Sequence, residues 1–215
     1  MVLSKRFKYF LIAGGMSFLF LASLHAESID KRINHPIVDN IHERNADGSS
    51  LKADQVLITP DQFLDSVQRG SFEIVKIALA QGMDINVQNE TAESALHLVK
   101  DVALAKYLIA RGANVNLLDR QFGMTPLFFQ EVAVARLLVA AGASVNAESS
   151  KGNTPIIWYA YSNYLEGIKY LVSAGADINA VNHDGKMVLD VAEGFSGPEL
   201  IEYLRSVGAE KRYGK

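Results

Sequence analysis

The residue types that most often carry chemistry do not form a catalytic or metal-binding set in this sequence. The chain has five His and no Cys, so disulfides, thiolate ligands and thiol nucleophiles are excluded. His35 and His42 are seven residues apart, which is not the spacing of two metal ligands on one helix. No Ser lies in a Gly-x-Ser-x-Gly motif, and no Gly-rich loop has a phosphate-binding pattern. We therefore expect no enzymatic activity, no metal and no cofactor.

The segment from Met1 to Ala26 has the composition and order of a secretory signal peptide. Lys5, Arg6 and Lys8 precede a mostly apolar run of sixteen residues from Tyr9 to Leu24, and Ala26 suits the position before a cleavage site. A membrane-spanning helix needs roughly 20 apolar residues, which is more than this run supplies. We predict a signal peptide over 1–26 and a periplasmic or secreted mature chain. The alternative is an uncleaved segment that anchors the chain in the membrane.

The charge of the mature chain excludes one class of partner. Residues 1–26 carry three positive and no negative charges, so cleavage changes the formal net charge from −3 to −6 (−3 − 3 = −6). A mildly acidic chain with no block of Lys or Arg lacks the basic surface that neutralises nucleic-acid phosphates. We expect no nucleic-acid partner and no membrane association after cleavage. The missing Cys suits an oxidising compartment.

Single Gly residues recur at a nearly constant period and indicate the elements of the fold. They are Gly82, Gly112, Gly142, Gly175 and Gly208, separated by two steps of thirty positions and then two of thirty-three. Apolar residues at offsets of one and four precede most of these Gly, as Ile74, Val75 and Ala78 do, and this pattern predicts a helix with one buried stripe. Gly readily adopts the left-handed conformation that ends a helix. Within the fourth of these helices, Gly167 is expected to weaken the helix by up to about 1 kcal/mol.

A polar turn and a second type of helix start complete the repeating unit. The turns after the Gly include Asp84-Ile85-Asn86 and Asn114-Val115-Asn116, and Thr125-Pro126-Leu127-Phe128 and Thr154-Pro155-Ile156-Ile157 then start helices. Two helices and an extended turn in about 33 residues resemble the ankyrin repeat, which is marked by Thr-Pro-Leu-His and a Gly-Ala-Asp-Val-Asn type of turn. The resemblance covers about residues 59–210. It implies an all-α repeat solenoid of about five ankyrin repeats over 59–215, preceded by a linker or N-terminal cap over 27–58.

The units are not identical. The stretch from Ile157 to Gly175 in unit four is three positions longer than the stretch from His97 to Gly112, and four longer than that from Phe128 to Gly142. Units two and three are therefore predicted to have shortened first helices or inter-helix turns. The finger over 117–124 is one residue longer than the next finger. The charged ending of unit five is what a C-terminal cap requires, because a terminal repeat has one face without a neighbour.

The resemblance also implies roles for His97 and for the aromatic cluster Trp158, Tyr159, Tyr161 and Tyr164. His97 occupies the Thr-Pro-Leu-His position, which in ankyrin repeats braces neighbouring turns through hydrogen bonds. The aromatic cluster has two interpretations: its rings fill the volume left by the shortened helices, or Trp158 or Tyr161 anchors a partner. Lys76, Lys106, Arg136 and Lys169 each precede a Gly by six residues, and we interpret this basic line as a solubilising outer face rather than an anion site.

In ankyrin proteins, partners are typically bound by the turn tips and by the exposed side of each first helix, on a concave surface. The resemblance therefore implies a monomeric protein-interaction scaffold, similar to exported bacterial ankyrin proteins. The alternatives within this fold are an immunity protein that neutralises a toxin and a secreted effector, and an enzyme is less favoured. Arg120, Phe122 and Tyr161 are the main candidates, because aromatic residues and Arg dominate binding hot spots. The full set of predicted partner-binding residues is Glu90, Glu93, Arg120, Gln121, Phe122, Met124, Lys151, Asn153, Trp158, Tyr161, His183 and Lys186.

Overall fold

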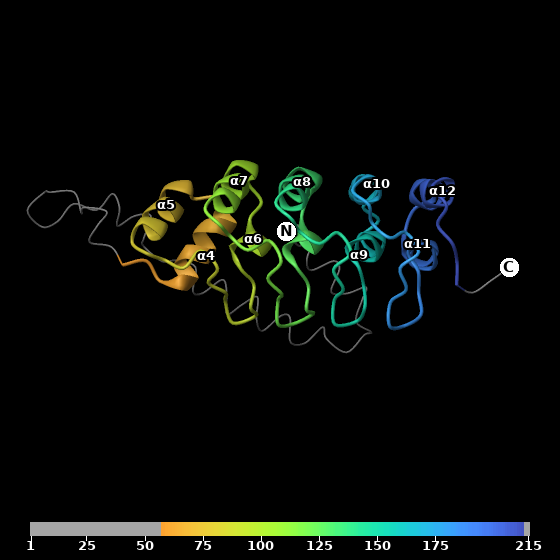
Figure 1. Cartoon of the computed structure of the whole chain (residues 1–215), viewed down its shortest axis with the longest axis horizontal. Coiled ribbons are helices and arrows are strands. Elements are labelled where there is room, and N and C mark those ends of the chain that lie inside the picture. The colour runs from red at the N-terminus through yellow and green to blue at the C-terminus, as the bar shows by residue number, and fades with distance from the viewer. Residues whose placement is uncertain (1–56, 213–215) are drawn as a thin grey trace, which may run out of the picture. The chain divides into compact units, whose positions relative to one another are not determined.

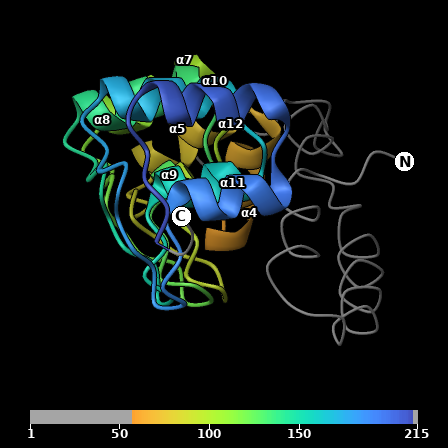
Figure 2. The same ribbon diagram turned by 90° about the vertical axis from the view of Figure 1, so that its right-hand side faces the viewer.

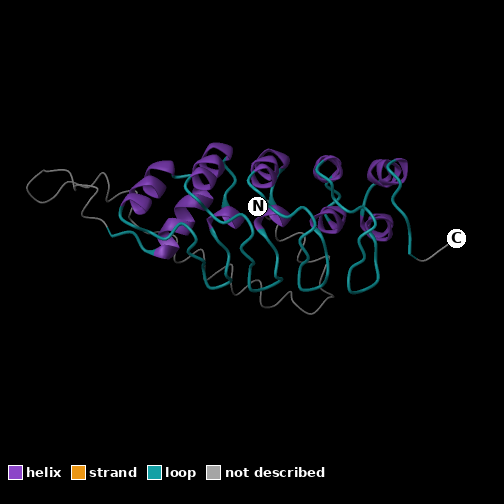
Figure 3. Ribbon diagram, viewed as in Figure 1, coloured by secondary structure: helices purple, strands orange, loops and turns teal. Residues whose placement is uncertain are grey.

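The computed structural model describes residues 57–212, and from Thr59 onward these belong to one compact unit that extends to Lys215. Within that unit, pairs of helices joined by loops follow one another along a single row (Figures 1 and 3). The predictions for 1–26 and for nearly all of 27–58 lie outside the described residues. Among the described residues, no helix is both long and apolar enough to cross a bilayer.

Each unit consists of a first helix, a second helix and a finger, by which we mean the long turn that leads to the next unit. The helix pairs are α4 (Pro60–Arg69) and α5 (Phe72–Ala80), α6 (Ala95–Leu98) and α7 (Val102–Ala110), η2 (Pro126–Phe129) and α8 (Val132–Ala140), α9 (Pro155–Tyr161) and α10 (Leu165–Ser173), and α11 (Val188–Phe195) and α12 (Pro198–Ser206). The fingers span 83–93, 113–124, 143–153 and 176–186. They project away from the layer of second helices, with the first helices between (Figure 2).

The helix boundaries follow from the predicted caps. At the first helix, the Thr59 hydroxyl accepts from the Gln62 amide at 3.4 Å, and the Gln62 side chain accepts from the Thr59 amide at 2.8 Å. This reciprocal pair is a capping box, and Pro60 supplies the fixed first turn. At the other end, the five periodic Gly residues all have φ between +88° and +92°, which confirms the predicted left-handed helix stops.

The core lies between successive helix pairs. The first four of the second helices bury the predicted stripe, which in α7 is Leu104, Ala105 and Leu108. The last one, α12, buries only Leu200 and Leu204, as expected of a helix whose outer side has no further repeat to contact. The prediction of an all-α repeat solenoid is confirmed.

The first helices of units two and three are shortened, as predicted. Helix α6 and the 3-10 helix η2 each have four residues, whereas α9 has seven. A helix this short leaves its last carbonyl groups without partners inside the helix, and such groups need donors when they are buried. The next unit supplies these donors. Gln130 Nε2 donates to Leu96 O at 2.9 Å and to His97 O at 3.3 Å.

Aromatic residues of unit four likewise supply hydrogen-bond donors to carbonyl groups of unit three. The Tyr159 hydroxyl lies 2.8 Å from both Leu127 O and Gln130 O, so its one proton is shared between two carbonyl groups of the shortened segment. The Tyr164 hydroxyl donates to Glu131 Oε2 at 2.7 Å and accepts from the Val132 amide at 3.1 Å. Burial and the Glu131 hydrogen bond raise the pKa of Tyr164 to about 12. The interpretation of the cluster as compensation for the shortened helices is confirmed for these two rings.

Gly167 has a positive structural role that sequence reasoning missed. A Cβ atom at this position would lie 2.4 Å from Tyr164 Cδ1 and 2.5 Å from Tyr159 Cδ2. The expectation that Gly167 merely weakens α10 is therefore incomplete. Its missing side chain is the space into which both rings pack.

The predicted basic line lies on the second helices, and two of its four members contact the following unit. The Arg136 guanidinium lies 4.6 Å from the centre of the Tyr170 ring, and Lys169 Nζ lies 5.8 Å from that of Tyr203. In both contacts the ring belongs to the following unit. Cation–π contacts of this kind contribute about 0.5–1 kcal/mol at exposed sites.

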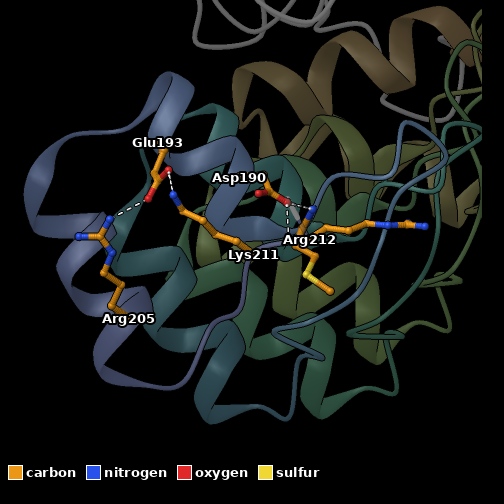
Figure 4. Close-up of polar contacts among 6 residues, drawn as sticks. Asp190, Glu193, Arg205, Lys211 and Arg212 are labelled. Carbon is orange, nitrogen blue, oxygen red and sulfur yellow. Dashed lines mark hydrogen bonds and ion pairs between the residues drawn. The ribbon is translucent and has the colours of Figure 1, made fainter. Parts of the chain in front are cut away.

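The end of the described chain is held against unit five, as a C-terminal cap requires. Glu193 Oε1 pairs with Arg205 Nη2 at 2.7 Å, and Glu193 Oε2 pairs with Lys211 Nζ (Figure 4). Asp190 Oδ2 accepts from the amide groups of Met187 and Arg212. The hydrogen bonds from Lys211 and Arg205 lower the pKa of Glu193.

Candidate protein-interaction surface

The fingers are held in shape by one polar side chain at the base of each tip. In the last finger, Asn182 Oδ1 accepts from the amides of Asp184 at 3.1 Å and Lys186 at 2.8 Å. Such side-chain oxygens replace a missing backbone partner in a tight turn. The four residues with this role are Asn89, Asp119, Ser149 and Asn182. These four residues were not predicted from the sequence, although each lies three residues after the Asn of the preceding polar turn.

Successive fingers are joined at their tips by backbone hydrogen bonds. The Arg120 amide donates to Thr91 O at 2.8 Å, the Ser150 amide to Phe122 O at 2.7 Å and the His183 amide to Lys151 O at 3.0 Å. Each bond connects one unit to the next. The tips therefore form a continuous row whose positions are fixed before any partner arrives.

A second row of inter-unit bonds runs along the start of the fingers. Asn86, Asn116, Asn146 and Asn179 each accept, through Oδ1, a backbone amide of the following unit at 2.8–3.0 Å. For Asn179 the donor is the Glu210 amide, so the C-terminal segment takes the place of a further unit. These two rows make the fingers rigid relative to one another.

His97 has the bracing role that the family resemblance implies. Its Nδ1 accepts from the Ser94 amide at 3.0 Å, so the ring proton of the neutral imidazole is on Nε2. Nε2 lies 3.1 Å from Met124 O in the next finger and donates to it. The side chain is 2% exposed. Both ring nitrogens are therefore occupied by structural hydrogen bonds, and His97 is not placed as a base.

The predicted partner-binding residues divide by exposure. The half-buried members are Glu93, Phe122 and Tyr161, and the exposed members are Glu90, Arg120, Gln121, Lys151, His183 and Lys186. Arg120 also donates from Nη1 to Glu90 O at 3.2 Å, so its guanidinium lies against the preceding finger. All nine remain candidates for partner contact.

Three of the predicted contact residues are buried. Met124 is 2% exposed and is part of the core, and Asn153 is 6% exposed with its Oδ1 accepting from Asn182 Nδ2 at 2.8 Å. Trp158 is 6% exposed and packs between Phe129 and Tyr161, with ring centres 6.5 and 6.4 Å away. Its burial and ring contacts support the packing interpretation of Trp158.

A row of aromatic rings follows the first helices beside the fingers. It continues from Phe129 through Trp158 and Tyr161 to Phe195, whose ring centre is 5.1 Å from that of Tyr161. Phe195 is 43% exposed and Tyr161 is half-buried. Burial, and then the charge of Asp184, raise the pKa of Tyr161, while a hydrogen bond with the Asn182 side chain acts in the opposite direction. The Tyr161 hydroxyl therefore points toward the base of the last finger.

We name the exposed side of the first helices, together with the fingers, the inner face. It offers fixed hydrogen-bonding groups, charged side chains at the tips and a partly exposed aromatic row, which are the groups of a recognition surface. Among residues 57–212, no group of three or more His, Asp or Glu side chains is placed to hold a metal ion.

Helix pairs stacked in one row and joined by hydrogen-bonded fingers define the class of repeat solenoids. A family model described as ankyrin repeats in three copies matches residues 99–182 and 129–213, which together make up more than half of the chain. The chain therefore belongs to the ankyrin-repeat family, whose members generally mediate protein–protein interaction. No curated protein shows significant sequence similarity to it.

Proposed function

We propose that this protein is a binding scaffold that holds one partner protein on its inner face and catalyses no reaction. The observation that carries the proposal is the double row of hydrogen bonds between units. The fingertips are joined by backbone bonds of 2.7–3.0 Å, and the finger starts by the Asn bonds of 2.8–3.0 Å. A surface fixed in this way loses little conformational entropy when a partner binds, which favours affinity.

The composition of the fingertips supports the same role. Arg120 and Phe122 lie on the second finger, whose tip has four residues between Asp119 and Met124, whereas the third has three between Ser149 and Asn153. A longer tip supports specific contact, because its extra residue has no counterpart on the neighbouring fingers. Arg and aromatic residues are the types most often found at binding hot spots.

We further propose that the partner is met outside the cytoplasm, after cleavage following Ala26. The order of basic residues, apolar run and small residue in 1–26 supports export. Mass spectrometry of the protein from the exported fraction tests this point. A mature N-terminus at Glu27 is expected, and a chain that retains Met1 in the membrane fraction would establish the anchored alternative.

The binding role is tested by site-specific photo-cross-linking from Gln121 in the native compartment. We expect one protein to be cross-linked by the wild type and lost in the double variant Arg120→Glu, Phe122→Ala. The matched control is Lys106→Glu on α7, an equal charge reversal on the layer of second helices, which should leave capture unchanged. Equal capture by the wild type and the finger variant would show that the fingers are not the binding surface.

A further inference from the structure

We infer that the inner face selects an extended partner segment with basic residues at one end and an aromatic or aliphatic side chain at the other, aligned in one direction along the stack. This inference rests on the proposed function and adds the chemistry and the direction of the partner. It follows from an unequal distribution of charge and of exposed rings along the inner face.

The acidic end is the first finger, 83–93. This finger carries Asp84, Glu90 and Glu93 and no Lys or Arg, whereas the second and third fingers each carry one acid and one base. Glu90 is exposed, and Glu93 is half-buried. Arg120 contacts this finger through Glu90 O, which still leaves an excess of negative charge there. A basic segment is the complement of such a surface.

The apolar end is at units four and five. Phe195 is 43% exposed and packs against the half-buried Tyr161 at 5.1 Å between ring centres, so the two rings form one apolar patch whose most exposed part is Phe195. Gly194 precedes Phe195 in α11, and no atom lies within 4 Å of the place a Cβ would take. A side chain of the partner therefore has room to lie beside the exposed ring.

The separation of the two ends sets the length of the segment. The first finger leads directly into unit two, and three helix-to-helix steps of about 8–10 Å separate unit two from unit five, which is about 24–30 Å. An extended chain advances about 3.3 Å per residue, so roughly eight or nine residues connect the ends. A single continuous segment is sufficient to contact both.

The rest of the surface favours this placement. The aligned cations Lys76, Lys106, Arg136 and Lys169 are on the second helices, whose layer lies away from the fingers (Figure 2). A basic segment is repelled there and attracted to the first finger, so the charge distribution orients the encounter. The net charge of the last finger is −1, from Asp177, Asp184 and Lys186.

The test uses the full-length mature protein and labelled synthetic peptides. The main probes have three Arg, a spacer of eight Gly and Ser residues, and Leu-Phe-Leu, in both chain directions. Matched probes replace the Arg residues with Glu or the Leu-Phe-Leu with Ser. Fluorescence anisotropy gives the affinities, and a double-mutant cycle combines the probes with Glu90→Gln and Phe195→Ala. Glu202→Gln on α12 is the control, with an equal charge change on an exposed side chain.

We expect the Arg probe that ends in Leu-Phe-Leu to bind most tightly. Glu90→Gln should weaken that probe about two- to fivefold and leave the Glu probe unchanged. Phe195→Ala should weaken it about tenfold and leave the Ser-ended probe unchanged. Glu202→Gln should have no effect, and thermal unfolding of each variant confirms that it is folded.

The inference is overturned by Glu probes that bind as tightly as Arg probes, by Ser-ended probes that bind as tightly as Leu-Phe-Leu probes, or by no binding at all. In each of these results, a partner still cross-linked from Gln121 leaves the proposed function intact. If no partner is cross-linked from Gln121, the proposed function fails, whatever the peptides show.

Discussion

A missing side chain at Gly167 allows two tyrosine rings to support the unit before them. The ring atoms lie 2.4–2.6 Å from the place of a Cβ, and the hydroxyl groups of Tyr159 and Tyr164 are held by hydrogen bonds to unit three. Neither ring can move away without losing those bonds. The packing of the two rings, and through them the support of the shortened helix, therefore depends on this glycine.

Gly167→Ala is expected to lower the free energy of unfolding, although alanine is the better helix former. Alanine gains up to about 1 kcal/mol in helix propensity, and overpacking against the rings costs about 1–3 kcal/mol. Urea denaturation measures the difference. Gly194→Ala is the matched control, since nothing lies within 4 Å of its Cβ position, and it should be neutral or stabilising. Wild-type stability for Gly167→Ala would mean that the rings do not depend on this space.

Met124 and Asn153 show that equivalent positions in successive fingers can differ in burial. Met124, Asn153, Lys186 and Glu93 share one place, because each accepts the backbone bond that closes its finger. Yet Lys186 is exposed, Glu93 is half-buried and the other two are buried. Equivalent backbone positions do not fix where a side chain points, and Met124 is apolar enough to enter the core. For Met124, the apolar residue type indicates burial better than the equivalent position in the finger does.

At the scale of the element, the period and the Gly stops were sufficient to predict the helices. The left-handed φ values of +88° to +92° and the four-residue lengths of α6 and η2 agree with expectations made from spacing alone. The donors that stabilise the short helices could not be predicted. Gln130 acts on the carbonyl groups of Leu96 and His97, which belong to the preceding unit, and no local pattern marks a partner so distant in the chain.

Gln130→Ala should destabilise the protein by about 1–3 kcal/mol, because it leaves buried carbonyl groups of α6 without a donor. Gln130 is 5% exposed, so water cannot readily replace the lost amide. Chemical denaturation checks this value. Gln68→Ala on the exposed side of α4 removes the same side chain and should change stability by less than about 0.5 kcal/mol. Equal effects of the two substitutions would contradict a capping role for Gln130.

For the whole molecule, each unit contacts only its neighbours, so stability is a sum of local terms. The C-terminal unit therefore depends on its own cap. At the C-terminal end, Glu193 joins α11 to α12 through Arg205 and to the final segment through Lys211 (Figure 4). Loss of this link should loosen the last unit without affecting the middle of the stack.

Glu193→Gln is expected to increase amide hydrogen exchange in α12 at neutral pH and to leave exchange in α7 and α8 unchanged. The folded pKa of Glu193 is lowered below its ordinary value of 4.5. Its stabilising contribution is therefore present above that value and is lost as the pH falls through the lowered folded pKa. The difference between wild type and variant should accordingly shrink in acid. Glu202→Gln on α12 provides the comparison, and a similar increase there would show that charge alone, rather than the link from α11 to the final segment, protects the last unit.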